Sequence, residues 1–181
     1  MAALELINHQ ELSGTATTMT YTSIPSTYKH LYFVASTRTD NGSGNINMGV
    51  RFYTGSSSEV SSGYSGRLFK IGGYLGSSTP TGAAQTSQAQ WSLIYEQGAG
   101  STANVFTSTE FLIANYNTSN YKQMLSYGTG TGDSTSNGQY NVNQAAHLNS
   151  ETAAITGLKL MSIYGSFVQY STLSIYGLNG A

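Results

Sequence analysis

The sequence predicts an all-β protein, a single antiparallel β-sandwich of the jelly-roll-like kind over residues 1–181. Two observations predict this class. Short runs rich in Tyr, Phe, Val, Ile and Thr recur along the whole chain, and clusters of Gly, Ser and Asn separate them. No segment has the periodicity of a long amphipathic helix, and no unit of about 20–50 residues repeats. We therefore expect about ten strands in one sandwich rather than a solenoid or a propeller.

The first third of the chain contains the clearest strands. Residues 1–12 are expected to form either an N-terminal arm or the first strand. Apolar residues at both odd and even positions of Lys29–Arg38 predict a central strand, because both faces must then be buried. Alternation in Asn45–Thr54 predicts a strand with one buried and one wetter face.

The next segment combines a strand with a polar stretch. Arg67–Leu75 is expected to be a strand with a bulge or bend at Gly72 and Gly73, because paired glycines weaken a ladder. Ser77–Ala89 contains Pro80 and few apolar residues, so a polar loop is expected there.

The second half predicts six further strands: Gln90–Glu96, Asn104–Tyr116, Tyr121–Tyr127, Gln139–Leu148, Ala153–Tyr164 and Val168–Leu178. The second and third of these are expected to pair as a hairpin, and the last two as a closing hairpin. Gly128–Gly138 is rich in Gly, Thr and Ser and is expected to be a loop at an exposed tip.

Charge is scarce in this chain. Charged residues make up 8% of it, against roughly 25% in an average soluble protein. The surface is therefore expected to be uncharged and polar, which suits lasting contacts, since few ions must be desolvated. The net charge of −1 provides no basic field for nucleic acid, and near-neutrality favours self-association.

Cysteine is absent, so disulfides and thiolate metal sites are excluded. The N-terminal residues lack a basic segment followed by an apolar one, and no stretch approaches about 18 apolar residues. Neither a secretion signal nor membrane insertion is therefore expected.

Two glycine-rich motifs are better explained as structure than as phosphate sites. Gly98–Ala103 matches the dinucleotide-binding fingerprint, and Gly128–Gly132 is similar in composition. Such motifs bind phosphate at the start of a helix, and no helix is expected after either segment. Both are therefore interpreted as turns, with no cofactor.

The titratable residues form no catalytic or metal-binding pattern. His9, His30 and His147 are isolated, so a surface or capping role is favoured over metal binding. Glu96 and Glu110 would make a glycosidase-like pair only if the fold brought them together. The sequence thus predicts a protein that is not an enzyme.

The fourteen tyrosines are the best candidates for partner contacts, because the ring packs against a partner while the hydroxyl stays hydrogen-bonded. Ordinary strand composition explains them equally well. Tyr53, Tyr64 and Tyr74 are expected beside loops or on a wetter face, whereas Tyr32 and Tyr164 are expected to be partly buried.

Several segments, in order along the chain, resemble a β-sandwich module of tailed-bacteriophage virion proteins: Ser23–Leu31, Val50–Phe52, Ile113–Tyr116, Thr152–Ile155, Gly165–Phe167 and Ser171–Leu178. The resemblance spans roughly Leu4–Leu178, and no single segment is chemically specific. The chain departs from the module at Tyr53–Gly55, where members often carry Asn after Arg-Phe.

The resemblance implies a trimeric component of the virion surface, without catalytic residues. The favoured role is a capsid decoration or cement protein that contacts the major capsid protein, since the strand pattern begins near Met1 and leaves no room for a fibre shaft. The alternative is a receptor-binding or carbohydrate-binding tail-fibre tip that contacts a host-surface glycan. A glycan-degrading enzyme on the same scaffold would require the two glutamates to meet in a cleft.

Overall fold

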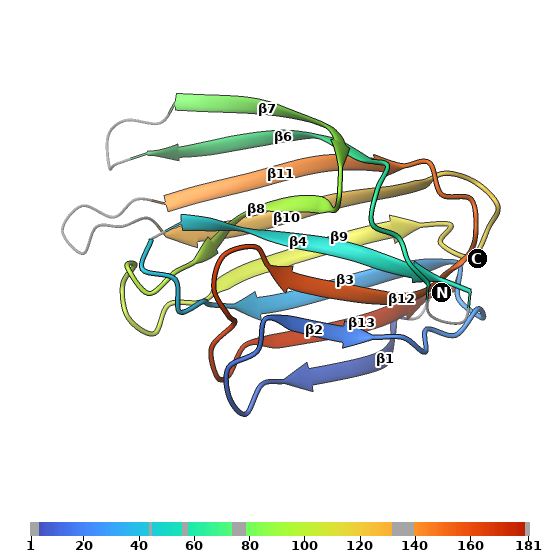
Figure 1. Ribbon diagram of the computed structural model, residues 1–181, viewed down its shortest axis with the longest axis horizontal. Helices are drawn as coiled ribbons and strands as arrows, with labels where there is room; N and C mark the ends of the chain where they lie inside the picture. The colour runs from blue at the N-terminus through green and yellow to red at the C-terminus, as the bar shows by residue number, and fades with distance from the viewer. Residues whose placement is uncertain (1–3, 44, 56–57, 74–78, 132–139, 180–181) are drawn as a thin grey trace.

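The protein is an antiparallel β-sandwich of two sheets (Figure 1). The computed structural model describes residues 4–179 except 44, 56–57, 74–78 and 132–139. Helix is absent from these described residues. Their strands are β1 (Leu4–Glu11), β2 (Thr18–Tyr21), β3 (His30–Thr37), β4 (Asn45–Thr54), β5 (Ser58–Glu59), β6 (Tyr64–Gly73), β7 (Thr79–Gln88), β8 (Trp91–Gln97), β9 (Thr107–Ala114), β10 (Lys122–Thr131), β11 (Tyr140–Asn149), β12 (Ile155–Ser162) and β13 (Thr172–Leu178).

The larger sheet has eight strands in the order β1-β13-β3-β9-β10-β11-β6-β7. All of its neighbours are antiparallel, and the first strand of the chain pairs with the last along Leu4–Glu11 and Thr172–Leu178. Buried and exposed residues alternate strictly along β9, in which Thr107, Thr109, Phe111 and Ile113 are buried. One face of this sheet is therefore the core face and the other faces outward.

The smaller sheet has five strands and covers the core face of the larger one (Figure 1). Its order is β2-β12-β4, and the far edge of β4 pairs with β5 near its end and with β8 over its first half. β7 extends beyond this cover, and all residues from 80 to 88 except the half-buried Gln85 are exposed. β7 is thus a polar edge strand that contributes little to the core.

Aromatic side chains fill the space between the sheets. Phe33 and Phe111 stack with ring centroids 4.5 Å apart. Phe52, Tyr64 and Trp91 pack against each other at 5.3–5.5 Å, and all three are fully buried. Burying rings of this size supplies most of the driving force for folding. The polar group of the buried Trp91 ring has a hydrogen-bond partner, because its Nε1 donates to the carbonyl of Leu148 at 3.2 Å.

A lysine is enclosed at one end of the sandwich. Lys122 has no exposed surface, and its Nζ donates to the carbonyl oxygens of Thr118, Asn120 and Thr152, the last two at 2.9 and 3.4 Å. Burial lowers the pKa of Lys122 from its ordinary value. The ammonium ties the β9–β10 turn to the segment before β12.

Most predicted strands are confirmed, with shifted ends. β4 occupies the predicted Asn45–Thr54, and β3 lies centrally between β13 and β9 as predicted, although its outward face is half-buried and not buried. The hairpin of β9 and β10 is confirmed, and residues 1–12 contain the first strand rather than a free arm.

Three local predictions are wrong. Residues 79–88 of the expected polar loop form β7, because an edge strand tolerates Pro80 and needs no apolar face. The ladder of β6 with β11 continues through Gly72 and Gly73 without a register shift, so the bulge expected there is absent. Residues 128–131 of the expected glycine-rich loop belong to β10; the rest of that loop, 132–139, lies outside the described residues.

The prediction that the last two strands form a closing hairpin is also wrong. β12 pairs with β2 and β4 in the smaller sheet, while β13 pairs with β1 and β3 in the larger one. The bridges of Phe167 to Ala16 and Thr39 hold the connection as it passes between the sheets. Strand pattern alone cannot distinguish a hairpin from two strands that pack face to face, because both bury alternate residues.

Candidate binding surface

The outward side of the larger sheet carries a group of exposed apolar side chains. They are 36–48% exposed and come from the four neighbouring strands β9, β10, β11 and β6. We call this group the outer apolar face, and it consists of Phe69, Ile71, Leu112, Leu125, Tyr127, Val142 and Leu148. Contiguous apolar patches of this kind are uncommon on monomers and usually mark interaction sites.

Cross-strand register makes these residues neighbours. Leu112 lies opposite Leu125, which lies opposite Ala146 and then Arg67. The next row runs from Glu110 to Tyr127, Gln144 and Phe69. Side chains directly opposite each other on one face are about 5 Å apart, so the rows form a continuous surface.

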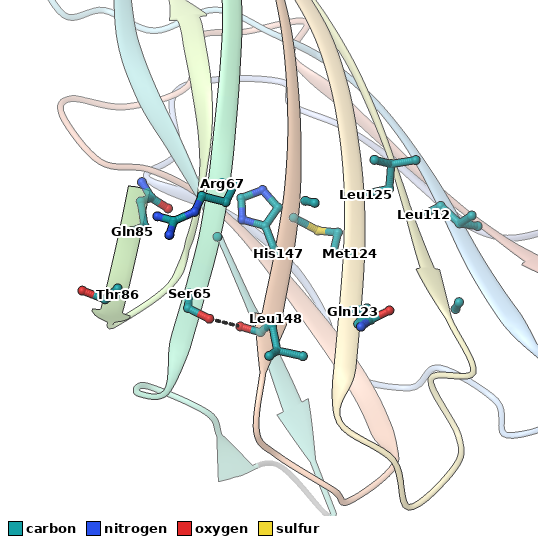
Figure 2. A pocket seen from close by; sticks show the side chains of 13 residues that line it. Ser65, Arg67, Gln85, Thr86, Leu112, Gln123, Met124, Leu125, His147 and Leu148 are labelled. Atoms are coloured by element: carbon teal, nitrogen blue, oxygen red, sulfur yellow. Dashed lines mark hydrogen bonds between the residues drawn. The ribbon is translucent and has the colours of Figure 1, made fainter. Parts of the chain in front are cut away.

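The surface is hollowed at one end. A shallow depression of about 540 Å³ crosses β7, β6, β11, β10 and β9. Leu112 and Leu125 lie on one side of it, and Arg67, Gln85 and Thr86 lie on the other (Figure 2). At the edge of the depression, the Ser65 hydroxyl on β6 donates to the carbonyl of Leu148 on β11 at 3.3 Å (Figure 2). The hollow is open and mostly apolar, unlike an enclosed catalytic cleft.

Tyrosines border the outer apolar face on the β3 and β13 side. The Tyr32 and Tyr176 rings are 6.3 Å apart, and the Tyr32 hydroxyl donates to Glu110. Tyr127 lies directly across from Glu110 and is 45% exposed. Aromatic rings beside a carboxylate form a surface that can both stack and hydrogen-bond.

The outward side of the smaller sheet holds an ion network. Glu59 on β5 accepts from Arg51 at 2.6 Å, from Lys159 at 2.9 Å and from the Tyr53 hydroxyl at 3.1 Å. Burial raises the pKa of Glu59, but the hydrogen bonds from these three groups outweigh it and lower the pKa to about 2. All three groups bond to the Glu59 carboxylate, so the network links β4, β5 and β12.

The tyrosines proposed as partner contacts have three different outcomes. Tyr53 is half-buried and belongs to the Glu59 network, where burial, followed by the Glu59 carboxylate, raises its pKa. Tyr64 was expected beside a loop or on a wetter face; it does follow a loop at the start of β6, but it is fully buried and donates to the carbonyl of Val60 at 2.8 Å, so its candidacy as a partner contact is wrong. Tyr74 lies outside the described residues.

The two tyrosines that were expected to be partly buried also have different outcomes. Tyr32 is half-buried on the outward side of β3. Tyr164 is 58% exposed in the turn after β12, so the prediction for it is wrong. The turn leaves the smaller sheet at this point, where Tyr164 and Gly165 are both exposed.

The histidines and glutamates are not brought together. His9 pairs with the Ser174 hydroxyl at 2.8 Å, and His30 accepts from the amide of Asn115 at 3.1 Å. Within the described part of the chain, no three His, Asp or Glu side chains are grouped in a way that could hold a metal ion. Glu110 faces outward on β9, while Glu96 is on β8 of the other sheet and its side chain lies outside the description.

The residues of the outer apolar face were not predicted from the sequence. The available signal was the presence of apolar side chains at both odd and even positions, as in Phe111-Leu112-Ile113 and Met124-Leu125. That signal was used for Lys29–Arg38, where it predicted burial on both sides. In β9 and β10 the same signal marks a core face and an uncovered face.

These features define an antiparallel β-sandwich with an uncovered, partly apolar sheet face. A comparison of the chain with models of known protein families and with curated proteins finds no match to either. Over the residues with a described structure, no helix is long and apolar enough to cross a membrane.

Proposed function

We propose that this chain is a structural protein of the virion surface of a tailed bacteriophage, a capsid decoration or cement protein. In this role it binds the major capsid protein, assembles as a homotrimer and stabilises the head lattice. It has no catalytic step and no cofactor. The observation that carries the proposal is the outer apolar face, because an uncovered sheet face of this size favours association with protein over solvation.

The segments that carry the family resemblance support the proposal through the fold. Three of them meet at one end of the sandwich: the Tyr116 hydroxyl donates to the carbonyl of Pro25, and the amide of Ile155 donates to Tyr116 at 3.0 Å. The amide of Ile24 donates to the carbonyl of Thr156 at 2.9 Å. These residues therefore position loops and strands, and partner contacts are assigned to other residues.

The scarcity of charge is a second support. On the outer apolar face the polar neighbours are mainly amides and hydroxyls, such as Gln123, Thr129 and Gln144. Such groups cost less to desolvate than ions when a partner covers them. A low desolvation cost of this kind favours a lasting contact within a capsid shell.

The test is immunogold labelling of intact virions with an antibody against this chain. Gold distributed over the head supports the decoration role, and gold at the tail contradicts it. Virions that lack the chain provide the control, and we expect their heads to rupture at lower temperature or lower ionic strength. Equal rupture thresholds would contradict the cement role even if the head is labelled.

A second candidate is a carbohydrate-binding tail tip, favoured by the Tyr32, Tyr127 and Tyr176 group beside Glu110. Sugars stack on aromatic rings and hydrogen-bond to carboxylates and amides. The test is binding of the purified chain to host-surface glycans, with Tyr127→Ala as the variant and the exposed Tyr170→Ala as its matched control. Loss of binding in the first variant alone favours this candidate, and no binding by the native chain removes it.

A further inference from the structure

Only two charges lie on the outward side of the four strands that bear the outer apolar face. Among the outward residues described for β9, β10, β11 and β6, Glu110 and Arg67 are the charged ones. They have opposite signs and are not paired with each other. Arg67 is exposed and forms no ion pair with any residue in the described part of the chain.

The two charges flank the apolar rows symmetrically. Glu110 is on β9 and Arg67 is on β6, with β10 and β11 between them. Three strand spacings separate them by about 14 Å across the sheet. Leu125, Tyr127 and Ala146 lie on the two strands between them.

A second copy can be placed face to face with the first by a two-fold axis that lies in the plane of the surface and passes between β10 and β11. This axis places β9 of each copy opposite β6 of the other. Each Glu110 then faces the Arg67 of the second copy, and the apolar rows face each other. Because the two charges lie in neighbouring rows, the axis is inclined to the strands. The charges are about 14 Å apart across the sheet and about 7 Å apart along it, so the axis is inclined by roughly 25° and the strands of the two copies cross at roughly 50°.

We propose that the outer apolar face binds the same face of a second copy of this chain through a two-fold contact, with reciprocal Arg67–Glu110 ion pairs at its rim. Such a contact is self-complementary, because each residue pair occurs twice. The proposal concerns the same face as the proposed function and names one of its partners. It is compatible with a homotrimer only if two trimers pair, which gives a hexamer with dihedral symmetry.

The size of the sheet is sufficient for such a contact. Eight strands of seven to ten residues present a face roughly 38 Å across and 24–34 Å along the strands. A stable interface needs about 800 Å² from each partner, with an apolar centre and a polar rim. Leu125, Tyr127 and Ala146 supply the apolar part of the centre, beside Gln144, while Arg67 and Glu110 supply the rim.

The first test is the mass of the full-length chain in solution, measured by light scattering and sedimentation at micromolar concentration. Six times the chain mass of 19.2 kDa is expected of two paired trimers, and twice that mass would support the two-fold contact while contradicting the proposed homotrimer. A monomer, or a trimer that does not pair further, would overturn the proposal. Either result would leave the virion location to be decided by gold labelling, so failure here is distinguishable from failure of the proposed function.

The second test reverses the charges. Arg67→Glu and Glu110→Arg alone should each weaken the two-fold contact at least about tenfold, because like charges then meet at both ends of the interface. The double variant, and an equimolar mixture of the two single variants, should restore it, since opposite charges face each other again. Unchanged association of the single variants, or no restoration on mixing, would overturn the proposal.

Lys29→Glu is the matched control for Arg67→Glu, since it makes the same change in net charge at an exposed site before β3. It should leave the association constant unchanged. Circular dichroism and the unfolding temperature of each variant check the fold, and restoration on mixing excludes misfolding as the cause of a loss.

Discussion

His147 is a titratable side chain enclosed in the core. It is 4% exposed on β11, its ring centroid lies 6.0 Å from that of Trp91, and its Nε2 is 3.4 Å from the Ser126 hydroxyl. Burial disfavours the charged imidazolium and lowers the pKa of His147 to about 4. The folded protein therefore holds this residue neutral.

This burial predicts a pH dependence of stability. Between the ordinary value of 6.5 and about 4, the unfolded chain binds a proton at His147 that the folded chain does not. The free energy of unfolding should therefore fall as the pH falls through this window. His147→Met should flatten the dependence there, as measured by urea unfolding at several pH values. An unchanged slope would contradict the prediction.

Gly177 lies directly against the ring of Tyr28. A Cβ at this buried position on β13 would overlap the ring of Tyr28. We expect Gly177→Ala to lower the free energy of unfolding by about 1–3 kcal/mol, because the ring has to move within a packed core.

The matched control is Gly82→Ala on β7, where the nearest atom to an added Cβ is the carbonyl oxygen of Leu68 at 3.7 Å. That substitution should be neutral or slightly stabilising, because it only restricts the unfolded chain. Thermal and chemical unfolding of both variants measure the difference, and equal effects would show that the Tyr28 contact is unimportant.

At the scale of elements, β5 is the shortest of the described strands and depends most on side-chain contacts. It is two residues long and is held beside β4 by the Glu59 contacts with Arg51, Tyr53 and Lys159. Two of these partners come from β4 and one from β12. A strand this short depends on its side chains, because two residues form few ladder hydrogen bonds.

Glu59→Gln should therefore lower the free energy of unfolding at neutral pH by about 1–2 kcal/mol. The pKa of Glu59 is lowered from 4.5 to about 2, so its stabilisation is complete above pH 4.5 and lost as the pH falls toward 2. The variant should lack this part of the acid dependence. Glu11→Gln, at an exposed residue without an ion pair to described residues, is the control and should keep it.

At the scale of the whole molecule, strand pairing is strongly non-local. β1 pairs with β13, and β3 lies between β13 and β9. The larger sheet therefore cannot be completed until both ends of the chain are in place. Folding of such topologies is limited by the closure of long loops.

We expect refolding to take milliseconds to seconds, as in other all-β sandwiches. Trp91 is the single tryptophan and is fully buried, so its fluorescence reports formation of the core. Stopped-flow dilution from urea gives the rate. A main phase faster than about a millisecond would contradict the expectation.

The sequence alone determined the fold class and most strand positions, because alternation of apolar residues and Gly, Ser and Asn punctuation are local signals. Asn45–Thr54 and Lys29–Arg38 were recognisable for this reason. The sequence also determined that charge is scarce, which sets the character of any interface.

Only the tertiary structure decided which strands are neighbours and which faces are covered. β12 and β13 look like a hairpin in the sequence but belong to different sheets, and Tyr64 and Tyr127 look alike although one is in the core and the other is exposed. The physical reason is that burial depends on what packs above a face. The smaller sheet covers one side of β9 and β10 and leaves Leu112, Leu125 and Tyr127 open on the other.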